Sequence, residues 1–362
     1  MKKKVLVIDD SALMRRVICD IINSDSRFEV KDITCNGEEG LQAMLTNRYD
    51  VVVMDMVMPR MDGLTVLREL QKRHKRVKIL VFSSKTTEGA QITMDALELG
   101  AVDFVHKPAS LTGASNEKFA AEFLSRLEEV SISRIIPTRS MPPAPAVAKP
   151  SAGARTPATP VITGAPKAGS AKQIVAIASS TGGPRALQSV IPYLPGNLAA
   201  PVLIVQHMPA GFTASLAERL NDVSNLRVVE GAENMEVVAG TVYIAPGGKH
   251  MHVVQKQNGH YIHLDDAPHR EGVKPCANYM YESLAECGYD SAVCVIMTGM
   301  GADGTEGVKN LKPCKKTYVI TQEQSTCAVY GMPRAAVAAG LSDQVEPLEN
   351  LASAITKNVG VK

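Results

Sequence analysis

Near the start of the sequence stands the run Val5-Leu6-Val7-Ile8-Asp9-Asp10-Ser11, in which apolar residues give way to two carboxylates. Further apolar runs follow at Val51–Met54, Ile79–Phe82 and Val102–Val105. Helical patterns lie between them, at Ala12–Ile22 and Glu38–Leu45. Near-continuous apolar strands that alternate with helices are typical of a parallel sheet covered on both faces. We therefore expect a doubly wound, flavodoxin-like α/β domain in this part of the chain.

The second half of the chain repeats the alternation of strands and helices. Its apolar runs are Ile174–Ala178, Pro201–Gln206, Thr241–Ala245, Ala292–Met297 and Thr317–Thr321. The same argument predicts a second doubly wound parallel sheet, of the Rossmann-like kind.

The composition changes sharply between residues 137 and 170. Prolines recur there among Ala, Ser, Thr, Gly and Lys, at positions 137, 142, 143, 145, 150, 157, 160 and 166. Such a segment has too little apolar surface to offset its ordering entropy, which predicts an extended linker. We expect one domain over residues 1–130, a Pro/Ala-rich linker over 131–171 and a second domain over 172–362.

Charge and cysteine usage exclude several classes of protein. The formal net charge is +2, and from residue 171 onward 15 Lys and Arg face 17 Asp and Glu. This balance, without a helix-turn-helix pattern, argues against a DNA-binding output and a nucleic-acid partner. No run approaches the roughly 20 apolar residues of a membrane span, so membrane insertion is not expected. The seven cysteines include no CxxC pair, which favours reduced thiols and a cytoplasmic location.

Polar side chains stand where the apolar runs of the first domain end: Asp9 and Asp10, then Asp55, Ser83 and Lys107. Doubly wound sheets bind ligands beyond the carboxyl ends of their strands. Three carboxylates brought together repel unless they share a cation, and oxygen ligands suit Mg²⁺. The combination predicts phosphoryl transfer to Asp55, with Ser83 bonding a phosphate oxygen and Lys107 balancing charge. Each feature alone has a plainer explanation, as a helix cap or a turn; their joint occurrence favours a site.

These residues resemble the response-regulator receiver family. The motifs are Val7-Ile8-Asp9-Asp10-Ser11, the run from Met54 to Gly63, Ser83 and Lys107-Pro108. The resemblance implies phosphorylation of Asp55 by a histidine kinase or its phospho-intermediate. It also implies a Mg²⁺ site in which Asp10, Asp55 and the backbone carbonyl of Val57 are direct ligands and Asp9 contributes through water. Phe104 matches the position of the family's aromatic switch residue.

In the second half, three strand ends lead to a serine, a histidine and an aspartate: Ser180, His207 and Asp303. A serine becomes a nucleophile when an imidazole takes its proton and a carboxylate orients that imidazole. The chain order Ser–His–Asp, without GxSxG, differs from that of α/β-hydrolases. One alternative remains open, because a Ser-Thr-Gly-Gly turn also cradles phosphate in nucleotide-binding proteins. The GxGxxG and GxxxxGK[ST] spacings that would support it do not occur at this turn.

The second half contains five other histidines that could be mistaken for the catalytic base, at positions 250, 252, 260, 263 and 269. The alternation in Met251–Gln255 and Tyr261–Leu264 predicts a hairpin, so we interpret them as structural or surface residues.

The second half resembles the catalytic domain of chemotaxis methylesterases. The motifs are Ser179-Ser180-Thr181-Gly182-Gly183, Gln206-His207-Met208-Pro209 and the run from Met297 to Gly304. The resemblance implies Ser180 as nucleophile, His207 as base and Asp303 as orienting carboxylate, with Thr181 and the backbone N–H of Met300 as oxyanion candidates. It implies cofactor-free hydrolysis of glutamyl methyl esters, and deamidation of glutamines, on the cytoplasmic domains of chemoreceptors. We expect the unphosphorylated receiver to pack over the hydrolase edge and block it.

Overall fold

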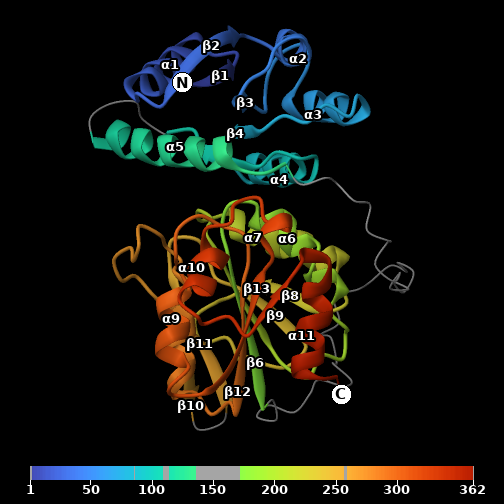
Figure 1. The fold of residues 1–362 in the computed structure, drawn as a ribbon, viewed down its shortest axis with the longest axis vertical. Helices are drawn as coiled ribbons and strands as arrows, with labels where there is room; N and C mark the ends of the chain where they lie inside the picture. The colour runs from blue at the N-terminus through green and yellow to red at the C-terminus, as the bar shows by residue number, and fades with distance from the viewer. Residues whose placement is uncertain (1, 85, 109–113, 136–171, 257–258, 362) are drawn as a thin grey trace, which may run out of the picture.

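The computed structural model describes residues 2–84, 86–108, 114–135, 172–256 and 259–361. Two parallel sheets flanked by helices form two domains, one above the other in Figure 1. The predicted fold class is therefore confirmed. Within the described residues, no helix has the length and hydropathy needed to cross a membrane.

The first domain is a five-stranded parallel sheet in the order β2-β1-β3-β4-β5. Its strands are β1 (Lys3–Ile8), β2 (Phe28–Thr34), β3 (Val51–Asp55), β4 (Ile79–Ser83) and β5 (Asp103–His106). Its helices are α1 (Ala12–Ser24), α2 (Gly37–Thr46), α3 (Gly63–Lys72), α4 (Thr87–Glu98) and α5 (Ala114–Ile132). The strand order reverses between β1 and β3, and ligands of such sheets bind at this point.

The second domain contains a seven-stranded sheet in the order β14-β13-β12-β6-β7-β9-β8, with every neighbouring pair parallel. Its strands are β6 (Gln173–Ser179), β7 (Val202–Gln206), β8 (Arg227–Glu230), β9 (Thr241–Ile244), β12 (Ser291–Ile296), β13 (Lys316–Gln322) and β14 (Gln344–Glu346). Its helices are α6 (Gly183–Gln188), α7 (Phe212–Val223), α8 (Ala277–Ser283), α9 (Thr305–Leu311), α10 (Met332–Ala338) and α11 (Leu351–Val359). The predicted hairpin is confirmed as β10 (His250–Lys256) and β11 (Gly259–Asp265), paired antiparallel.

Alternating side chains of the central strands build a core on each face of the sheet. In β1, Val5 and Val7 belong to one buried cluster, whereas Leu6 and Ile8 belong to another. This follows from the two-residue period of a strand. From Val5 to Ile8 the strand β1 is apolar on both faces, so the polar residues that follow Ile8 stand at its carboxyl end, where ligands of such sheets bind.

The two domains meet through α4, α5 and β5 of the first and the sheet edge with α6 and α7 of the second (Figure 1). Phe104 of β5 stacks on Phe212 of α7, with ring centroids 4.5 Å apart. Helix α5 runs to Ile132, and the Arg134 backbone N–H donates to the Ala328 carbonyl of the second domain at 2.8 Å. Most of the expected linker, residues 136–171, lies outside the described residues.

Candidate active site and receiver pocket

The structure brings together the three carboxylates singled out in the first domain. Oxygens of Asp9, Asp10 and Asp55 lie within 4.8 Å of one another. Lys107, just beyond β5, places its Nζ 2.5 Å from Asp55 Oδ2 and 3.4 Å from Asp9 Oδ2. The four side chains come from the ends of three strands, as the sequence predicted.

The donor set of this pocket fits a hard divalent cation. Burial raises the pKa of Asp9, opposed by the Lys107 ammonium and reinforced by the nearby Asp55 carboxylate. Asp9 Oδ2 is buried and, apart from its 3.4 Å ion pair with Lys107, makes no hydrogen bond among the described residues. A cation at the three carboxylates would relieve both the repulsion and the unsatisfied oxygen, and oxygen-only ligation is what Mg²⁺ prefers.

Of the other predicted receiver residues, Val57 and Ser83 lie beside Asp55, whereas Phe104 lies elsewhere. A cavity of about 70 Å³ is lined by Asp55, Val57, Ser83 and Lys107, among others. The Ser83 hydroxyl accepts from Thr93 Oγ1 at 2.6 Å. Val57 is exposed next to Asp55. Phe104 does not line this cavity, because its ring is buried at the junction between the domains.

In the second domain, a tight turn between β6 and α6 holds Ser180. Gly182 has a φ of 76°, which favours glycine, and caps α6 ahead of Pro184. A Cβ on Gly183 would lie 1.9 Å from Gln206 Oε1, so only glycine lets β7 approach the turn this closely. The Ser180 N–H donates to the Thr298 carbonyl at 3.0 Å, which fixes Ser180 between the ends of β6 and β12.

The two adjacent serines have different surroundings. The Ser179 hydroxyl donates to Gln206 Oε1 at 2.7 Å, and Gln206 Nε2 donates to the Ser180 carbonyl at 2.9 Å. Ser179 is therefore occupied by a structural hydrogen bond. Ser180 lies at the switch point between β6 and β12, where a reacting hydroxyl is expected.

His207 and Asp303 form a buried pair beside this turn. His207 Nε2 lies 2.7 Å from Asp303 Oδ2. The backbone N–H of His207 donates to the Ser179 carbonyl, which ties the start of the His207 loop to the end of β6. The sequence-predicted serine, histidine and aspartate thus lie at the ends of neighbouring strands.

Asp303 remains a carboxylate in spite of its burial. Burial alone would raise the pKa of Asp303, but hydrogen bonds from His207, Cys276 and the Ala277 N–H outweigh it and hold that pKa below its usual value. An ionised Asp303 can fix the orientation of the His207 ring and stabilise its protonated form.

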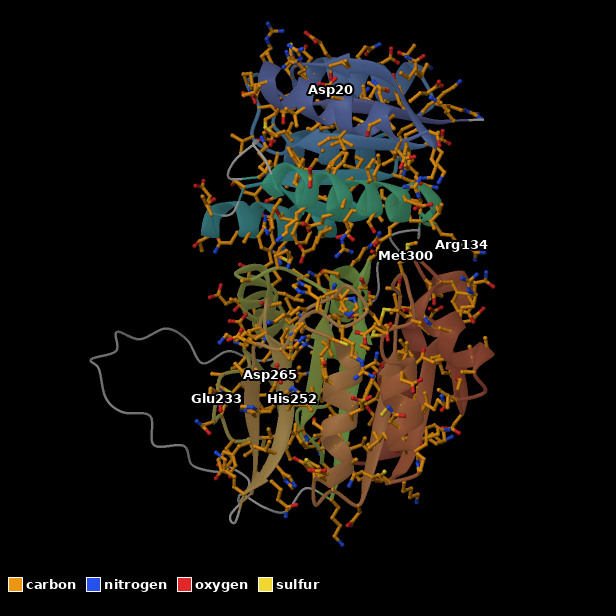
Figure 2. The ribbon with its side chains drawn as sticks, turned by 90° about the vertical axis from the view of Figure 1, so that its left-hand side faces the viewer. Asp20, Arg134, Glu233, His252, Asp265 and Met300 are labelled. Atoms are coloured by element: carbon orange, nitrogen blue, oxygen red, sulfur yellow. The ribbon has the colours of Figure 1, made fainter. Side chains whose placement is uncertain are left out.

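The two oxyanion candidates differ in accessibility. Met300 is 37% exposed, and Figure 2 places it at the edge of the second domain that faces the first. Thr181 is buried, and its hydroxyl contacts the first domain: Thr181 Oγ1 donates to Glu129 and accepts from Arg126 Nη1 at 3.2 Å.

These contacts belong to a larger set of polar bonds across the junction. Within the first domain, Arg126 also pairs with Asp103, at 3.3 Å, which helps to hold the guanidinium in place beside Thr181. Burial raises the pKa of Asp103, and the Arg126 guanidinium opposes that rise. On the other side of the junction, Arg219 of α7 pairs with both Asp95 and Glu98 of α4.

Sequence reasoning did not identify Gln206, Arg126, Glu129, Arg219 or Cys276 as part of this region. Gln206 stands directly before His207 in a quoted motif, so its position was a usable signal. Arg126, Glu129 and Arg219 are charges on amphipathic helices, a pattern that normally indicates a solvated face. Each of them has a partner on the other domain, which no local pattern reveals.

Comparisons with known proteins agree with both halves of this description. Residues 175–355 match the family model described as CheB methylesterase, and residues 5–113 match that of the response regulator receiver domain. The chain is 40% identical over 358 residues to a protein-glutamate methylesterase/protein-glutamine glutaminase of Bacillus subtilis (strain 168), covering 98% of each chain. It is also 40% identical to the protein of that name in Geobacillus kaustophilus (strain HTA426), covering 99% of each. The crystal structure of the Thermotoga maritima CheB methylesterase catalytic domain has a TM-score of 0.50 and 40% identity, and covers 51% of this chain and 98% of that one.

Proposed function

The chain belongs to the CheB family of receiver-controlled protein-glutamate methylesterases/protein-glutamine glutaminases, and from this we propose how its own residues carry out and control the reaction. It is a hydrolase of glutamyl methyl esters under phosphorylation control in chemotaxis adaptation. The observation that supports our assignment best is the buried His207–Asp303 pair beside the Ser180 turn.

In the proposed reaction, Ser180 Oγ attacks the ester carbonyl and His207 takes its proton. Because His207 Nε2 faces Asp303, this nitrogen carries the hydrogen and Nδ1 is left to act as the base. The backbone N–H of Met300, with Thr181 as a further candidate, stabilises the oxyanion. His207 then gives this proton to the departing methoxide, which leaves as methanol, and water hydrolyses the glutamyl–Ser180 ester to a free glutamate and regenerates the Ser180 hydroxyl. A glutamine substrate would release ammonia in the same way.

We propose that the receiver in this arrangement inhibits the hydrolase. Glu129 and Arg126 hold the hydroxyl of Thr181, the residue next to the nucleophile. The same face of the receiver covers the substrate side of the sheet edge (Figure 1). A large protein substrate therefore reaches Ser180 only when the domains separate, and phosphorylation of Asp55 would favour that separation.

At the receiver, Asp9, Asp10, Asp55 and the Val57 backbone carbonyl would hold Mg²⁺. When bound, the cation supplies charge neutralisation for the incoming phosphoryl group. Asp55 is the acceptor, Lys107 would bind a phosphate oxygen after leaving its present pair with Asp55, and Ser83 would bind another. Movement of Lys107 and β5 would be transmitted to Phe104, the predicted switch residue.

The receiver suggests a histidine kinase as phosphoryl donor, and the hydrolase acts on methylated proteins. We propose that these substrates are the cytoplasmic domains of chemoreceptors and that the protein works in the cytoplasm. Its cysteines support a reducing compartment, because all seven are free thiols.

The test is methanol release from methylated receptor, with and without a small-molecule phosphoryl donor. Wild type should be stimulated by the donor, Ser180→Ala should be inactive, and Ser179→Ala should keep most of its activity. Activity that persists in Ser180→Ala and disappears in Ser179→Ala would refute the assignment of the nucleophile.

A further inference from the structure

Cys276 occupies an unusual place beside the reacting groups. It is fully buried and is the residue directly before α8, the N-cap position. An N-cap side chain normally accepts a hydrogen bond from the first turn of its helix, but Cys276 makes no such bond. Instead, Asp303 accepts from the N–H groups of Ala277 and Asn278, at 2.6 and 3.0 Å. The Asp303 carboxylate therefore satisfies the N–H groups at the start of α8 in place of the N-cap side chain. The Cys276 thiol is not needed for capping and can make a different hydrogen bond.

The Cys276 thiol points at the same carboxylate. Its Sγ lies 3.0 Å from Asp303 Oδ1, while Asp303 Oδ2 faces His207. Burial and the adjacent carboxylate raise the pKa of Cys276 well above its usual value, so the sulfur keeps its proton. A protonated thiol next to an ionised carboxylate must be the donor of this hydrogen bond.

His250 holds Cys276 from the opposite side. The Cys276 N–H donates to His250 Nδ1 at 3.2 Å, so the hydrogen of this ring lies on Nε2, 3.1 Å from the Pro268 carbonyl. Burial lowers the pKa of His250, which keeps the ring neutral and able to accept. The backbone of Cys276 is therefore anchored independently of Asp303.

We propose that Cys276 is a positioning residue for the esterase reaction. A carboxylate rotates about its Cβ–Cγ bond; the Ala277 and Asn278 N–H groups each hold one oxygen of Asp303, and the Cys276 thiol adds a side-chain donor on Oδ1 that restricts the rotation further. The Cys276 thiol thereby directs Oδ2 at His207 and keeps the imidazole aligned for Ser180. This proposal rests on the proposed function, because it assigns Cys276 a role within the Ser180–His207–Asp303 reaction.

The experiment compares two buried thiols in the full-length protein. Methanol release from methylated receptor is measured with a phosphoryl donor present, as kcat and KM. Cys276→Ala should lower kcat about tenfold and leave KM within about twofold, as expected when an outer partner of a reacting group is removed. Cys276→Ser should restore most of kcat, since a hydroxyl also donates. Cys287→Ala is the matched control, because the Cys287 thiol contacts the carbonyls of Val253 and Ser283 rather than Asp303.

A pH profile separates positioning from loss of packing. Without the thiol donor the pKa of Asp303 rises, so the acid limb of kcat/KM in Cys276→Ala should move to higher pH. A packing defect would lower kcat/KM by the same factor at every pH and leave the position of the acid limb unchanged. That result would overturn the proposal.

Other outcomes are equally decisive. An unchanged kcat in Cys276→Ala, with wild type active, overturns the role of Cys276 alone, whereas an inactive wild type overturns the proposed function itself. If Cys276→Ala shows no cooperative thermal transition, the proposal is tested with Cys276→Ser instead. A kcat close to that of wild type supports a hydrogen-bond donor at position 276, and a loss of about tenfold in kcat overturns the proposal.

Discussion

Arg219→Ala should raise the activity of the enzyme in the absence of a phosphoryl donor. Arg219 of α7 donates to Asp95 Oδ1 at 2.6 Å and to both oxygens of Glu98, all on α4. These ion pairs join the two domains and touch none of the reacting groups. Their loss should shift the equilibrium from the inhibited arrangement toward the separated one.

The magnitude follows from how exposed the pairs are. The side chains of Arg219, Asp95 and Glu98 are 36%, 40% and 34% exposed, so each pair contributes at the scale of a surface ion pair, about 0.2–1 kcal/mol. Together they stabilise the inhibited arrangement by about 1 kcal/mol, which corresponds to roughly a fivefold change in an equilibrium constant. If the inhibited arrangement predominates, activity without the phosphoryl donor should rise by the same factor.

The assay is methanol release from methylated receptor, with and without a phosphoryl donor. Arg219→Ala should raise only the rate without donor, and added salt should reduce the difference from wild type because it screens exposed charges. Lys312→Ala, which removes an ion pair with Asp343 inside the second domain, is the matched control. An unchanged rate without donor, or an equal rise under both conditions, would refute the reasoning.

Three further outcomes are expected. Ser180→Ala should lose at least about a thousandfold in kcat, because the Ser179 and Thr181 hydroxyls are held by Gln206 and Glu129, whereas Ser179→Ala should lose far less; single-turnover methanol release measures both. Asp55→Asn should keep the activity seen without a phosphoryl donor and lose all stimulation by it, which the same assay detects. Mg²⁺ affinity should begin to fall at a pH above the ordinary titration range of a carboxyl group, because the pKa of Asp9 is raised and a protonated carboxyl is a poor ligand; calorimetric titrations at several pH values measure this, and a fall confined to the ordinary carboxyl range would contradict a part for Asp9.

The sequence predicted those parts of the fold that depend on local pattern. Central strands such as β3 and β6 are buried on both faces: every residue of β3 and nearly every residue of β6 is buried. Such strands appear in the sequence as short, nearly continuous apolar runs, which made them predictable. The edge strands β2, β8 and β14 were not among the predicted runs. In β2 only Phe28 is buried and charged residues stand between the apolar ones, and β14 has only three residues. Their pairing depends on the neighbouring strand rather than on their own composition.

The same distinction holds for the candidate site. The residues at strand ends were predictable, because the carboxyl edge of a parallel sheet gathers them wherever they lie in the chain. Cys276 was not, since its relation to Asp303 arises only when α8 packs beside the loop that follows β12. The contacts of Thr181 with α5 depend on how the domains pack together, and this is encoded in side chains that appear individually ordinary.

Strand β5 links the two sites physically. Its first residue, Asp103, pairs with Arg126, which in turn contacts Thr181 beside Ser180, the proposed nucleophile. Its second, Phe104, stacks on Phe212 of the hydrolase domain. Lys107 follows the end of the strand and contacts Asp55.

A phosphoryl group on Asp55 would draw Lys107 away from its present position. Because a short strand moves as a unit, Phe104 and Asp103 would be displaced as well. Two of the contacts at the junction, the Phe104–Phe212 stack and the Arg126–Thr181 bond, are therefore linked to the strand whose end lies beside Asp55. This gives phosphorylation of Asp55 a short physical route to the turn that holds Ser180.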